Sequence, residues 1–497
     1  MSVAGTLPQH ARRRPDRVAV VCDGARVTWR ELDHAVLCIA AHLAATVPAG
    51  RGVALHLPNG PALVMLFLAA CRAGREAQIL DPGWPAAMTQ SVIAALSPGL
   101  VVTTDEGLSC ASPLLRLNND IDFHNVAAAL GAAETHGLLP EPDPLQPFYV
   151  GFTSGSTGMP KGFRRHHRSW TESFRAGDRE FDIGANDVVL APGTLTHSLF
   201  LYALAHGLDV GATVVLCRQF RPTAANRLLR EYRATVIYGV PTQLEAMLDA
   251  ADRAGDEAFS EVRWILSSGA KWKARSAAAL RTRFPAARFA EFYGASELSF
   301  TTVVKDDENV PPDAVGRAFR DVVITIRDHE GHVLPPGEAG LVFVESPFVF
   351  MGYACGASEP PRRIGDAITV GDVGRLDERG FLHLVGRASR MIISSGKNVH
   401  PEEVERVLER HPAVDAAAVL GVADRQRGER LVAMIRPRDA TLVDRAGLIR
   451  HAREALPLYK IPRKYAVPRI WPTTRSGKAD FAALAAMWER GDCEAVE

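Results

Sequence analysis

One segment of the chain, residues 152–162, surrounds a lysine with small and hydroxylated residues and reads FTSGSTGMPKG. Free backbone N–H groups and neighbouring hydroxyls can wrap an anion, and the ammonium group of Lys161 adds a point charge suited to phosphate. Lys161 follows Pro160 and precedes Gly162, so the Gly-Lys-Ser/Thr helix start of a Walker loop is missing. We therefore predict a nucleotide-phosphate loop of another type. Its expected binding residues are Thr153, Ser154, Gly155, Ser156, Thr157, Gly158 and Lys161.

Four other short motifs accompany this loop. They are LPNG at 57–60, EFYGASE at 291–297, TVGD at 369–372 followed by Gly386-Arg387, and RSGK at 475–478. In this order, and over nearly the whole chain, the five motifs resemble those of the adenylate-forming superfamily. That superfamily comprises acyl- and aryl-CoA synthetases, adenylation domains of peptide synthetases, and firefly luciferase. The resemblance implies a large body that binds ATP and an acid, and a small mobile carboxyl-terminal domain.

The resemblance also implies a reaction. A carboxylate is a poor electrophile, but its attack on the α-phosphate of ATP releases pyrophosphate and gives an acyl-adenylate with AMP as the leaving group. This chemistry needs mainly charge neutralisation and positioning. In the family pattern, Lys478 contacts the carboxylate and the α-phosphate, Glu297 holds Mg²⁺, and Thr157 belongs to the catalytic set.

The nucleotide has further expected contacts in the same pattern. Tyr293 would stack on adenine, and the backbone at Ser268 to Ala270 would lie along the edge of the ring. Asp372 would accept hydrogen bonds from the ribose hydroxyls, and Arg387 would reach the ribose or a phosphate. The implied nucleotide-binding residues outside the phosphate loop are Gly269, Ala270, Tyr293, Gly294, Ser296, Asp372, Arg387 and Lys478.

The acid pocket is expected among mostly apolar segments with small residues, which leave room for an aliphatic or aromatic tail. Its candidate residues are His197, Tyr238, Gly239, Gly269 and Ala270. His197 would orient the acid or help admit the thiol, although a lone histidine after a strand is often only structural. The segment LTHSLFL at 195–201 offers no carboxylate for an α-ammonium group, which disfavours an α-amino acid. The predicted substrate is a fatty or aryl monocarboxylate, with the fatty acid preferred.

Three places depart from the family pattern. One consists of Ser156 and Ser296, which stand where Thr is common and keep the hydroxyl. Ser389 stands at the hinge, where Asp or Lys is usual, and a small residue there still permits rotation. The usual Gly-Gly of the following strand reads Ser395-Gly396. Because that strand lines the pantetheine tunnel in relatives, Ser395 bears on the thiol half-reaction.

A basic stretch precedes and includes the last motif. Between Glu454 and Asp480 there are six lysines and arginines and no acid. This charge suits an approach to ATP, while a solvated basic face is an equally good interpretation for residues 460–469. The expected cofactors are therefore ATP and Mg²⁺, with CoA or a carrier-protein phosphopantetheine as the thiol.

The leading hypothesis is an AMP-forming acyl-CoA synthetase. The runner-up is a stand-alone adenylating enzyme that loads an acyl carrier protein. From other classes, a luciferase-like oxygenase and a non-catalytic nucleotide sensor are weighed, and retention of Lys161, Glu297, Asp372 and Lys478 argues against the sensor. The sequence leaves open whether the protein is a monomer or a homodimer.

These residues need a scaffold, and apolar runs alternate with helical patterns to supply one. Residues 17–21, 30–45, 52–58 and 61–74 read as strand, helix, strand, helix, and a second βα series starts at Asp187. Such alternation predicts two parallel α/β subdomains. Short strands from about Val315 predict a small β-barrel, and an α+β pattern follows. We expect an N-terminal AMP-binding domain over residues 1–386 and a mobile domain over residues 387–497.

Composition limits the remaining classes. The chain has 497 residues, 57 basic and 57 acidic side chains and 47% hydrophobic residues, which argues against disorder and against nucleic-acid binding. Seven scattered cysteines without a CxxC pair suggest a reduced, cytoplasmic protein. The longest apolar run, residues 62–71, is shorter than the about 20 residues that cross a bilayer. No integral membrane association is expected.

Overall fold

The computed structural model describes residues 2–118, 121–133, 135, 137, 139–153, 159–269, 272, 274–357, 359–394, 397–424, 428–439, 443–473 and 479–496. The predicted site residues Ser154 to Gly158, Ala270, Ser395 and Lys478 lie outside them. By its contacts, the chain divides into two units. The first unit holds Met1–Ile324 and Val344–Ile368, and the second holds Thr325–Phe343 and Thr369–Glu497.

A nine-stranded sheet forms one half of the first unit, in the order β15-β14-β13-β12-β11-β9-β10-β1-β2. Strands β1, β10, β9, β11, β12 and β13 run parallel, and β2, β14 and β15 add antiparallel edges. The strands are β1 Val18–Cys22, β2 Ala25–Thr28, β9 Val188–Ala191, β10 Thr213–Leu216, β11 Val236–Gly239, β12 Trp264–Ser268, β13 Arg288–Ala295, β14 Ser299–Lys305 and β15 Arg317–Ala318.

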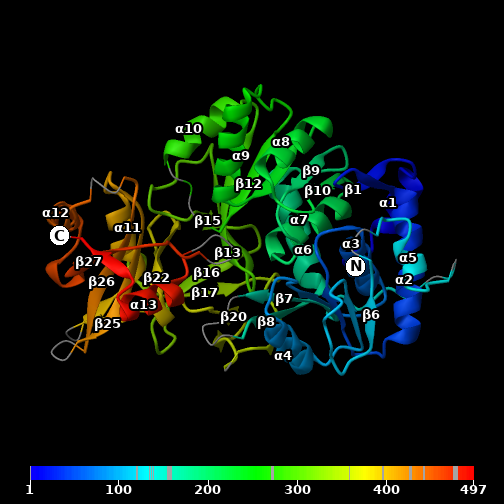
Figure 1. Cartoon of the computed structure of the whole chain (residues 1–497), viewed down its shortest axis with the longest axis horizontal. Helices are drawn as coiled ribbons and strands as arrows, with labels where there is room; N and C mark the ends of the chain where they lie inside the picture. Colours follow the sequence, from blue (N-terminus) through cyan, green and yellow to red (C-terminus); the bar gives the residue numbers. More distant parts are fainter. Residues whose placement is uncertain are drawn as a thin grey trace. The chain divides into compact units, whose positions relative to one another are not determined.

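Helices cover both faces of this sheet because its strands alternate buried apolar side chains between the two sides. Leu190, Val215 and Ile237 pack with helices α8, α9 and α10, while Gly207 of α7 lies against Val189 and Val214. Figure 1 shows α8 and α9 on one side of the strands and α6 and α7 on the other. The helices are α6 His167–Phe181, α7 Ser198–Asp209, α8 Pro222–Glu231, α9 Pro241–Ala254 and α10 Ala274–Arg283.

A seven-stranded sheet forms the other half, in the order β18-β8-β7-β4-β3-β5-β6. The apolar run noted in the sequence becomes α3, every residue of which is buried. The hairpin β19 Arg363–Ile364 and β20 Ala367–Ile368 completes the unit. The strands are β3 Val53–His56, β4 Ala77–Leu80, β5 Leu100–Thr103, β6 Leu114–Arg116, β7 Pro147–Thr153, β8 Lys161–His166 and β18 Gly352–Cys355, and the helices are α1 Leu7–Arg13, α2 Trp29–Thr46, α3 Pro61–Arg72, α4 Ala86–Leu96 and α5 Val126–Ala129.

The second unit begins with antiparallel strands and continues as an α+β fold. Its last sheet has the order β24-β23-β26-β27-β28, with β25 paired to β26. Strands β16 Val323–Arg327 and β17 Gly340–Glu345 belong to this unit only over residues 325–327 and 340–343. Its other strands are β21 Asp372–Leu376, β22 Leu382–Arg387, β23 Ile392–Ser394, β24 Lys397–Val399, β25 Val414–Asp424, β26 Gly428–Pro437, β27 Lys464–Pro468 and β28 Cys493–Ala495. Its helices are α11 Pro401–Glu409, α12 Arg445–Ala455 and α13 Phe481–Arg490, with 3₁₀ turns η1 Ala388–Arg390 and η2 Leu458–Lys460.

The division by contacts differs from the domain boundary expected between residues 386 and 387. Arg406 of α11 donates hydrogen bonds to the carbonyls of Leu384 and Val385 in β22. These bonds join β22 to the elements that follow it, and the second unit takes in Thr369–Glu497 together with Thr325–Phe343. The boundary at residue 386 stays a prediction about motion, which a division by contacts does not address.

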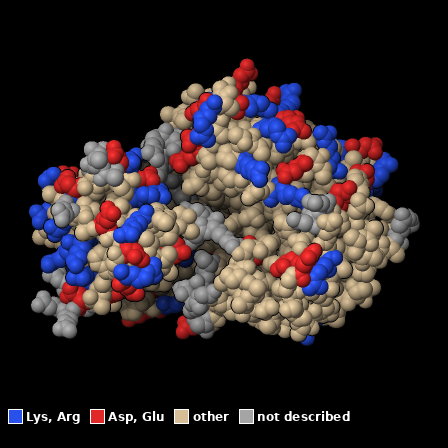
Figure 2. Space-filling model, viewed as in Figure 1, with Lys and Arg blue, Asp and Glu red and all other residues tan. Residues whose placement is uncertain are grey.

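The hydropathy of the helices and the charge on the surface bear on membrane association and on binding to nucleic acid. Among the described residues, no helix combines the length and hydropathy needed to cross a membrane. Figure 2 shows basic and acidic side chains intermixed on the visible face of the chain. Both signs of charge are therefore present on this face.

We predict an acid sensitivity of the fold that arises at His167. Its ring is fully buried and stacks on Phe148, and its Nδ1 accepts a hydrogen bond of 3.1 Å from the backbone N–H of Val3. Burial lowers the pKa of His167 to about 3. In the unfolded chain the histidine pKa is about 6.5, so the unfolded state takes up this proton at a higher pH than the folded state does. The contribution of His167 to the free energy of unfolding is therefore fully present above pH 6.5 and is lost as the pH drops towards 3.

The test compares thermal unfolding at pH 7 and pH 5. Between these two pH values, protonation of His167 should lower the free energy of unfolding of the wild type by roughly 2 kcal/mol. In His167→Asn the side-chain oxygen replaces Nδ1 as the acceptor and does not titrate, so the drop in melting temperature should be smaller. His329→Asn, at a side chain that is 90% exposed, is the control and should behave as the wild type. An equal drop in all three proteins would contradict the prediction.

Candidate functional site

Parallel strands of the nine-stranded sheet end at one edge, and the predicted residues of the first unit follow those ends. Tyr238 and Gly239 end β11, Gly269 follows β12, and Tyr293 and Gly294 lie near the end of β13. The register pairs Gly239 with Ser267 and Ser268 with Phe292 across adjacent strands. Ligands of open α/β sheets bind at the carboxyl edge of the strands. The fold thus gathers these residues where a ligand is expected.

A sharp turn after β13 presents the next two predicted residues, Ser296 and Glu297. A Cβ at Gly294 would lie 1.9 Å from the carbonyl oxygen of Ser299, so no larger residue fits there. Ser299 itself has a φ of +63°. The close approach of β13 to β14 therefore depends on glycine, as the Tyr-Gly motif requires.

Glu297 is buried and held at both its backbone and its side chain. Its carbonyl accepts a hydrogen bond of 2.8 Å from the N–H of Phe350, and its Oε1 accepts one of 3.0 Å from the hydroxyl of Tyr353. The ammonium nitrogen of Lys161 lies 5.6 Å from the centroid of the same tyrosine ring. Tyr353 had no expected role, because its short strand β18 carries no motif. It connects the predicted metal ligand with the predicted phosphate lysine.

The two ends of the phosphate loop lie side by side. Thr153 ends β7 and Lys161 begins β8, and the two residues are paired in the antiparallel register. The five residues between Thr153 and Met159 lie outside the described part of the chain. The loop is therefore the connection of a β-hairpin, as its small residues predict.

This donor set fits the magnesium ion that accompanies ATP. Mg²⁺ is usually bound by one or two carboxylates together with substrate phosphates and waters. Glu297 supplies a buried carboxylate, and Lys161, near the ring of the same Tyr353, is a group for phosphate. Glu297 would hold the ion, which would neutralise charge on the phosphates.

A buried asparagine shapes the loop that carries His197. The amide of Asn59 donates to the carbonyls of Gly193 and Cys217, each at 2.9 Å, and its oxygen accepts from the N–H of Leu195 at 2.8 Å. His197 is the N-cap residue of α7 and is half-buried. The LPNG motif thus has a structural task that its spacing alone did not reveal.

The first turn of α7 also contacts the Ser296 turn. The hydroxyl oxygens of Ser198 and Ser296 are 3.1 Å apart. The turn that carries Ser296 and Glu297 therefore touches the start of α7, next to His197.

Tyr238 lies deeper than its place in the expected pocket implied. Its side chain is 1% exposed, and its hydroxyl is 3.1 Å from Nδ1 of His206, whose Nε2 is 2.7 Å from Asp178. The sequence indicated no role for this buried polar group, because its members come from three distant segments. The tyrosine ring is part of the hydrophobic core, and the adjacent Gly239 stays a pocket candidate.

An aromatic wall lies behind Ser299. The ring of Phe300 is stacked on Phe319 at 4.5 Å and meets Phe292 and Tyr202 edge-on at 4.7 and 5.2 Å. All four rings are buried. The four rings therefore form an apolar, aromatic cluster next to Ser299.

The predicted ribose residues belong to the second unit and contact each other. Asp372 and Arg387 face each other in the β21–β22 register, and Nε of Arg387 lies 2.9 Å from Oδ1 of Asp372. Asp372 is 5% exposed, and Ala388 donates a backbone hydrogen bond of 2.8 Å to Gly371. The carboxylate and the guanidinium are therefore held as a pair.

The hinge candidate Ser389 is the exposed middle residue of η1. The next residue, Arg390, forms ion pairs of 3.0 Å with Glu402 and 2.7 Å with Glu405, and its guanidinium lies 3.6 Å from the ring centre of Phe481. Because Arg390 is tied to α11, any rotation at Ser389 would have to leave these contacts in place or exchange them.

Two lysines of the basic stretch before the last motif contact different residues. Lys460 forms an ion pair of 2.6 Å with Glu403, and the ammonium of Lys464 lies 5.7 Å from the ring centre of Trp488. Lys460 thus has a structural partner, which favours the non-catalytic interpretation for this residue. Lys478 lies outside the described residues.

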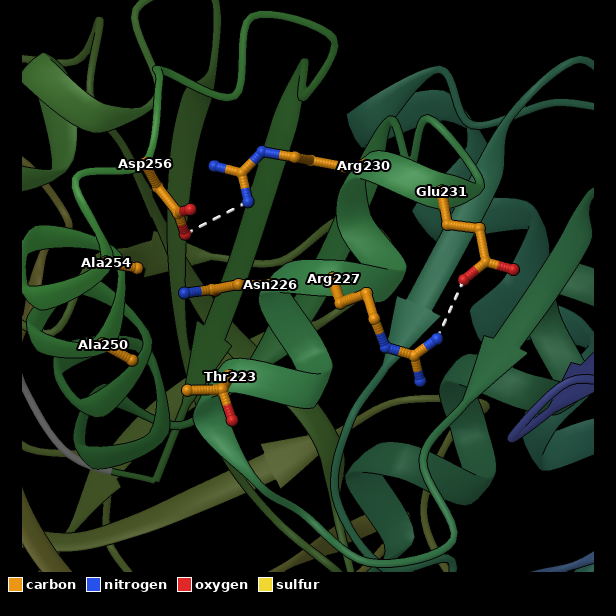
Figure 3. A pocket seen from close by; sticks show the side chains of 8 residues that line it. All are labelled: Thr223, Asn226, Arg227, Arg230, Glu231, Ala250, Ala254 and Asp256. Atoms are coloured by element: carbon orange, nitrogen blue, oxygen red, sulfur yellow. Dashed lines mark hydrogen bonds and ion pairs between the residues drawn. The ribbon is translucent and has the colours of Figure 1, made fainter.

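A cavity of about 370 Å³ lies elsewhere, between α8 and α9. Figure 3 shows its walls, with Arg227 paired to Glu231 and Arg230 paired to Asp256, each at 3.1 Å. No predicted site residue lines it. Because its charges are paired within the walls, it does not compete with the strand ends as the candidate site.

Comparisons with known proteins match this picture. Residues 7–354 match the family model "AMP-binding enzyme", and residues 403–478 match "AMP-binding enzyme C-terminal domain". An uncharacterized acyl-CoA ligase, YhfT of Bacillus subtilis (strain 168), is 38% identical over 96% of each chain. The feruloyl-CoA synthase of an Amycolatopsis species is 32% identical over 95% of this chain and 96% of that one.

A solved structure agrees with the fold. The amide bond synthetase McbA from Marinactinospora thermotolerans superposes with a TM-score of 0.83 at 28% identity, over 98% of this chain and 99% of that one. The resemblance that the motifs suggested and the two-part α/β fold are both confirmed. The chain belongs to the AMP-binding enzyme family.

Proposed function

We propose that this enzyme activates a carboxylic acid with ATP, releases pyrophosphate to form an acyl-adenylate, and transfers the acyl group to the thiol of CoA. The class, an AMP-binding ligase of the acyl-CoA synthetase type, is that of its relatives. The observation that carries the proposal is the arrangement of Lys161, Tyr353 and Glu297, in which one tyrosine has a cation near its ring and a buried carboxylate bound to its hydroxyl.

The chain's own residues would act mainly by positioning charge. Lys161 and the hydroxylated loop would hold the β- and γ-phosphates, and Tyr293 and Gly294 would hold adenine at the end of β13. Asp372, paired with Arg387, would accept from the ribose. Lys478 would neutralise the carboxylate and the α-phosphate as they meet, and preorganised charge of this kind is the main source of catalysis in such reactions.

The acid is proposed to be a fatty or aryl monocarboxylate. The buried rings of Phe300, Phe292 and Tyr202 form an apolar wall beside the expected pocket. Such rings offer no cationic partner to a second carboxylate, and the segment LTHSLFL at 195–201 offers no carboxylate to an α-ammonium group. His197, at the start of α7, is proposed to orient the carboxylate.

The thiol acceptor is proposed to be CoA, with carrier-protein phosphopantetheine as the alternative. The similarity to an amide bond synthetase adds an amine as an acceptor that should be tested. We further propose a cytoplasmic enzyme, because all seven cysteines are unpaired in the structure.

The test is a pyrophosphate-release screen. Fatty acids of increasing length, cinnamic and benzoic acids, and amino acids would each be supplied with Mg²⁺-ATP and with CoA, a holo-carrier protein or a simple amine. We expect release with apolar monocarboxylates, faster turnover with CoA than with the other acceptors, and little release with amino acids. Light emission or oxygen uptake with an added substrate would instead support an oxygenase, and release confined to amino acids would overturn the proposal.

A further inference from the structure

Arg165 occupies an unusual position under the candidate site. It lies on β8, four residues after Lys161, and is 1% exposed. Its Nε and Nη2 both donate to the carbonyl oxygen of Ser296, at 3.1 and 2.6 Å. Its Nη1 donates to the carbonyl oxygen of Phe348 at 2.6 Å and to the hydroxyl of Ser169 at 3.4 Å. One guanidinium thus joins three separate segments of the first unit.

Among the described residues, Arg165 donates hydrogen bonds to two backbone carbonyls and a hydroxyl, and none of these acceptors is a carboxylate. Burial accordingly lowers the pKa of Arg165 to about 10, and the negative charge of Glu297 opposes this shift. A buried charge is costly, and an apolar chain of similar length would fill the same space without that cost. Packing alone therefore does not explain why an arginine is buried at this position.

The two carbonyls that Arg165 holds belong to segments that also bond to each other. Ser296 precedes Glu297, and Phe348 lies two residues before Phe350, whose N–H donates to the carbonyl of Glu297 at 2.8 Å. Tyr353, a few residues further on, donates to the carboxylate of Glu297. Arg165 therefore fixes both sides of the backbone link that carries this carboxylate.

We propose that Arg165 is a positioning residue for Glu297. Its five-donor fork locks the turn at Ser296 to the segment at Phe348, and thereby holds the carboxylate at a fixed place relative to Lys161 on the same strand as Arg165. This inference rests on the proposed function, in which Glu297 receives the magnesium ion of Mg²⁺-ATP. Lysine would not replace arginine here, because one ammonium cannot donate to the Ser296 carbonyl twice and also reach Phe348 and Ser169.

The test measures binding rather than turnover. Calorimetric titrations with a non-hydrolysable ATP analogue, with and without Mg²⁺, give the factor by which the metal tightens binding. In Arg165→Met this factor should fall at least about tenfold, and in Arg165→Lys by about threefold or more. Binding of the metal-free analogue should change little, because adenine contacts come from other residues.

Arg164→Met is the matched control. Arg164 is the preceding residue of β8, is half-buried, and forms an ion pair of 2.5 Å with Glu76. This variant should keep the wild-type metal factor. If Arg165→Met fails to fold, Arg165→Lys decides the question.

Each other outcome has a definite meaning. A wild-type metal factor in Arg165→Lys, or an equal loss with and without Mg²⁺ in the Arg165 variants, would overturn the positioning role and leave the proposed function intact. A wild-type protein that shows no metal factor, or that binds no ATP analogue, would overturn both.

Discussion

Replacing Lys478 by alanine should reduce acid-dependent ATP–pyrophosphate exchange by about a thousandfold or more. As the carboxylate attacks the α-phosphate, two anionic groups approach each other, and one preorganised cation between them is worth several powers of ten in related phosphoryl chemistry. The second half-reaction has a neutral thioester product and a leaving AMP, so it makes less use of this charge. Transfer from a supplied acyl-adenylate to CoA should therefore stay within a few-fold of the wild type.

Lys464→Ala is the matched control for that experiment. Lys464 belongs to the same acid-free stretch, is exposed, and lies beside Trp488. If the stretch acts only as a solvated basic face, the two alanine variants should have similar small effects. Equal losses of both half-reactions in Lys478→Ala would contradict the assigned role.

The family, the ligase class and the α/β fold were predictable because they depend on local patterns. The strand and helix alternation at 17–74 and from Asp187 appears in the structure as two mainly parallel sheets with covering helices. The glycine of the Tyr-Gly motif follows from a contact of 1.9 Å that excludes a Cβ. Motifs report such constraints directly, since each is formed by neighbouring residues.

The supporting contacts were not predictable, because they join residues far apart in the chain. Tyr353 reaches Glu297 across 56 positions, and Asn59 reaches Gly193 across 134. Tyr238 was expected in the pocket, yet its hydroxyl contacts His206 in the core. A pattern of types and spacings contains no information on which distant side chain fills a given hydrogen bond.

Glu297→Gln should raise the Mg²⁺ concentration needed for half-maximal pyrophosphate exchange by about ten- to a hundredfold, which corresponds to roughly 1.5–3 kcal/mol for a contact with a charged group. Glutamine keeps the shape of the side chain, and its oxygen can still accept from the hydroxyl of Tyr353. The fold around the turn should therefore survive. The loss would come from the missing negative charge alone, since a hard cation prefers carboxylate oxygen.

Tyr353→Phe tests the hydrogen bond to Glu297 without changing the charge of the carboxylate. The variant removes the 3.0 Å hydrogen bond to Oε1 of Glu297 and leaves the carboxylate, so the required Mg²⁺ concentration should rise by less than about fivefold. The same substitution keeps the ring beside Lys161, and a phenylalanine face still attracts a cation. Binding of ATP without metal should thus be unchanged in both variants. An unaltered Mg²⁺ dependence in Glu297→Gln would mean that the ion is held by other groups, and the buried carboxylate would then be a structural partner of Tyr353.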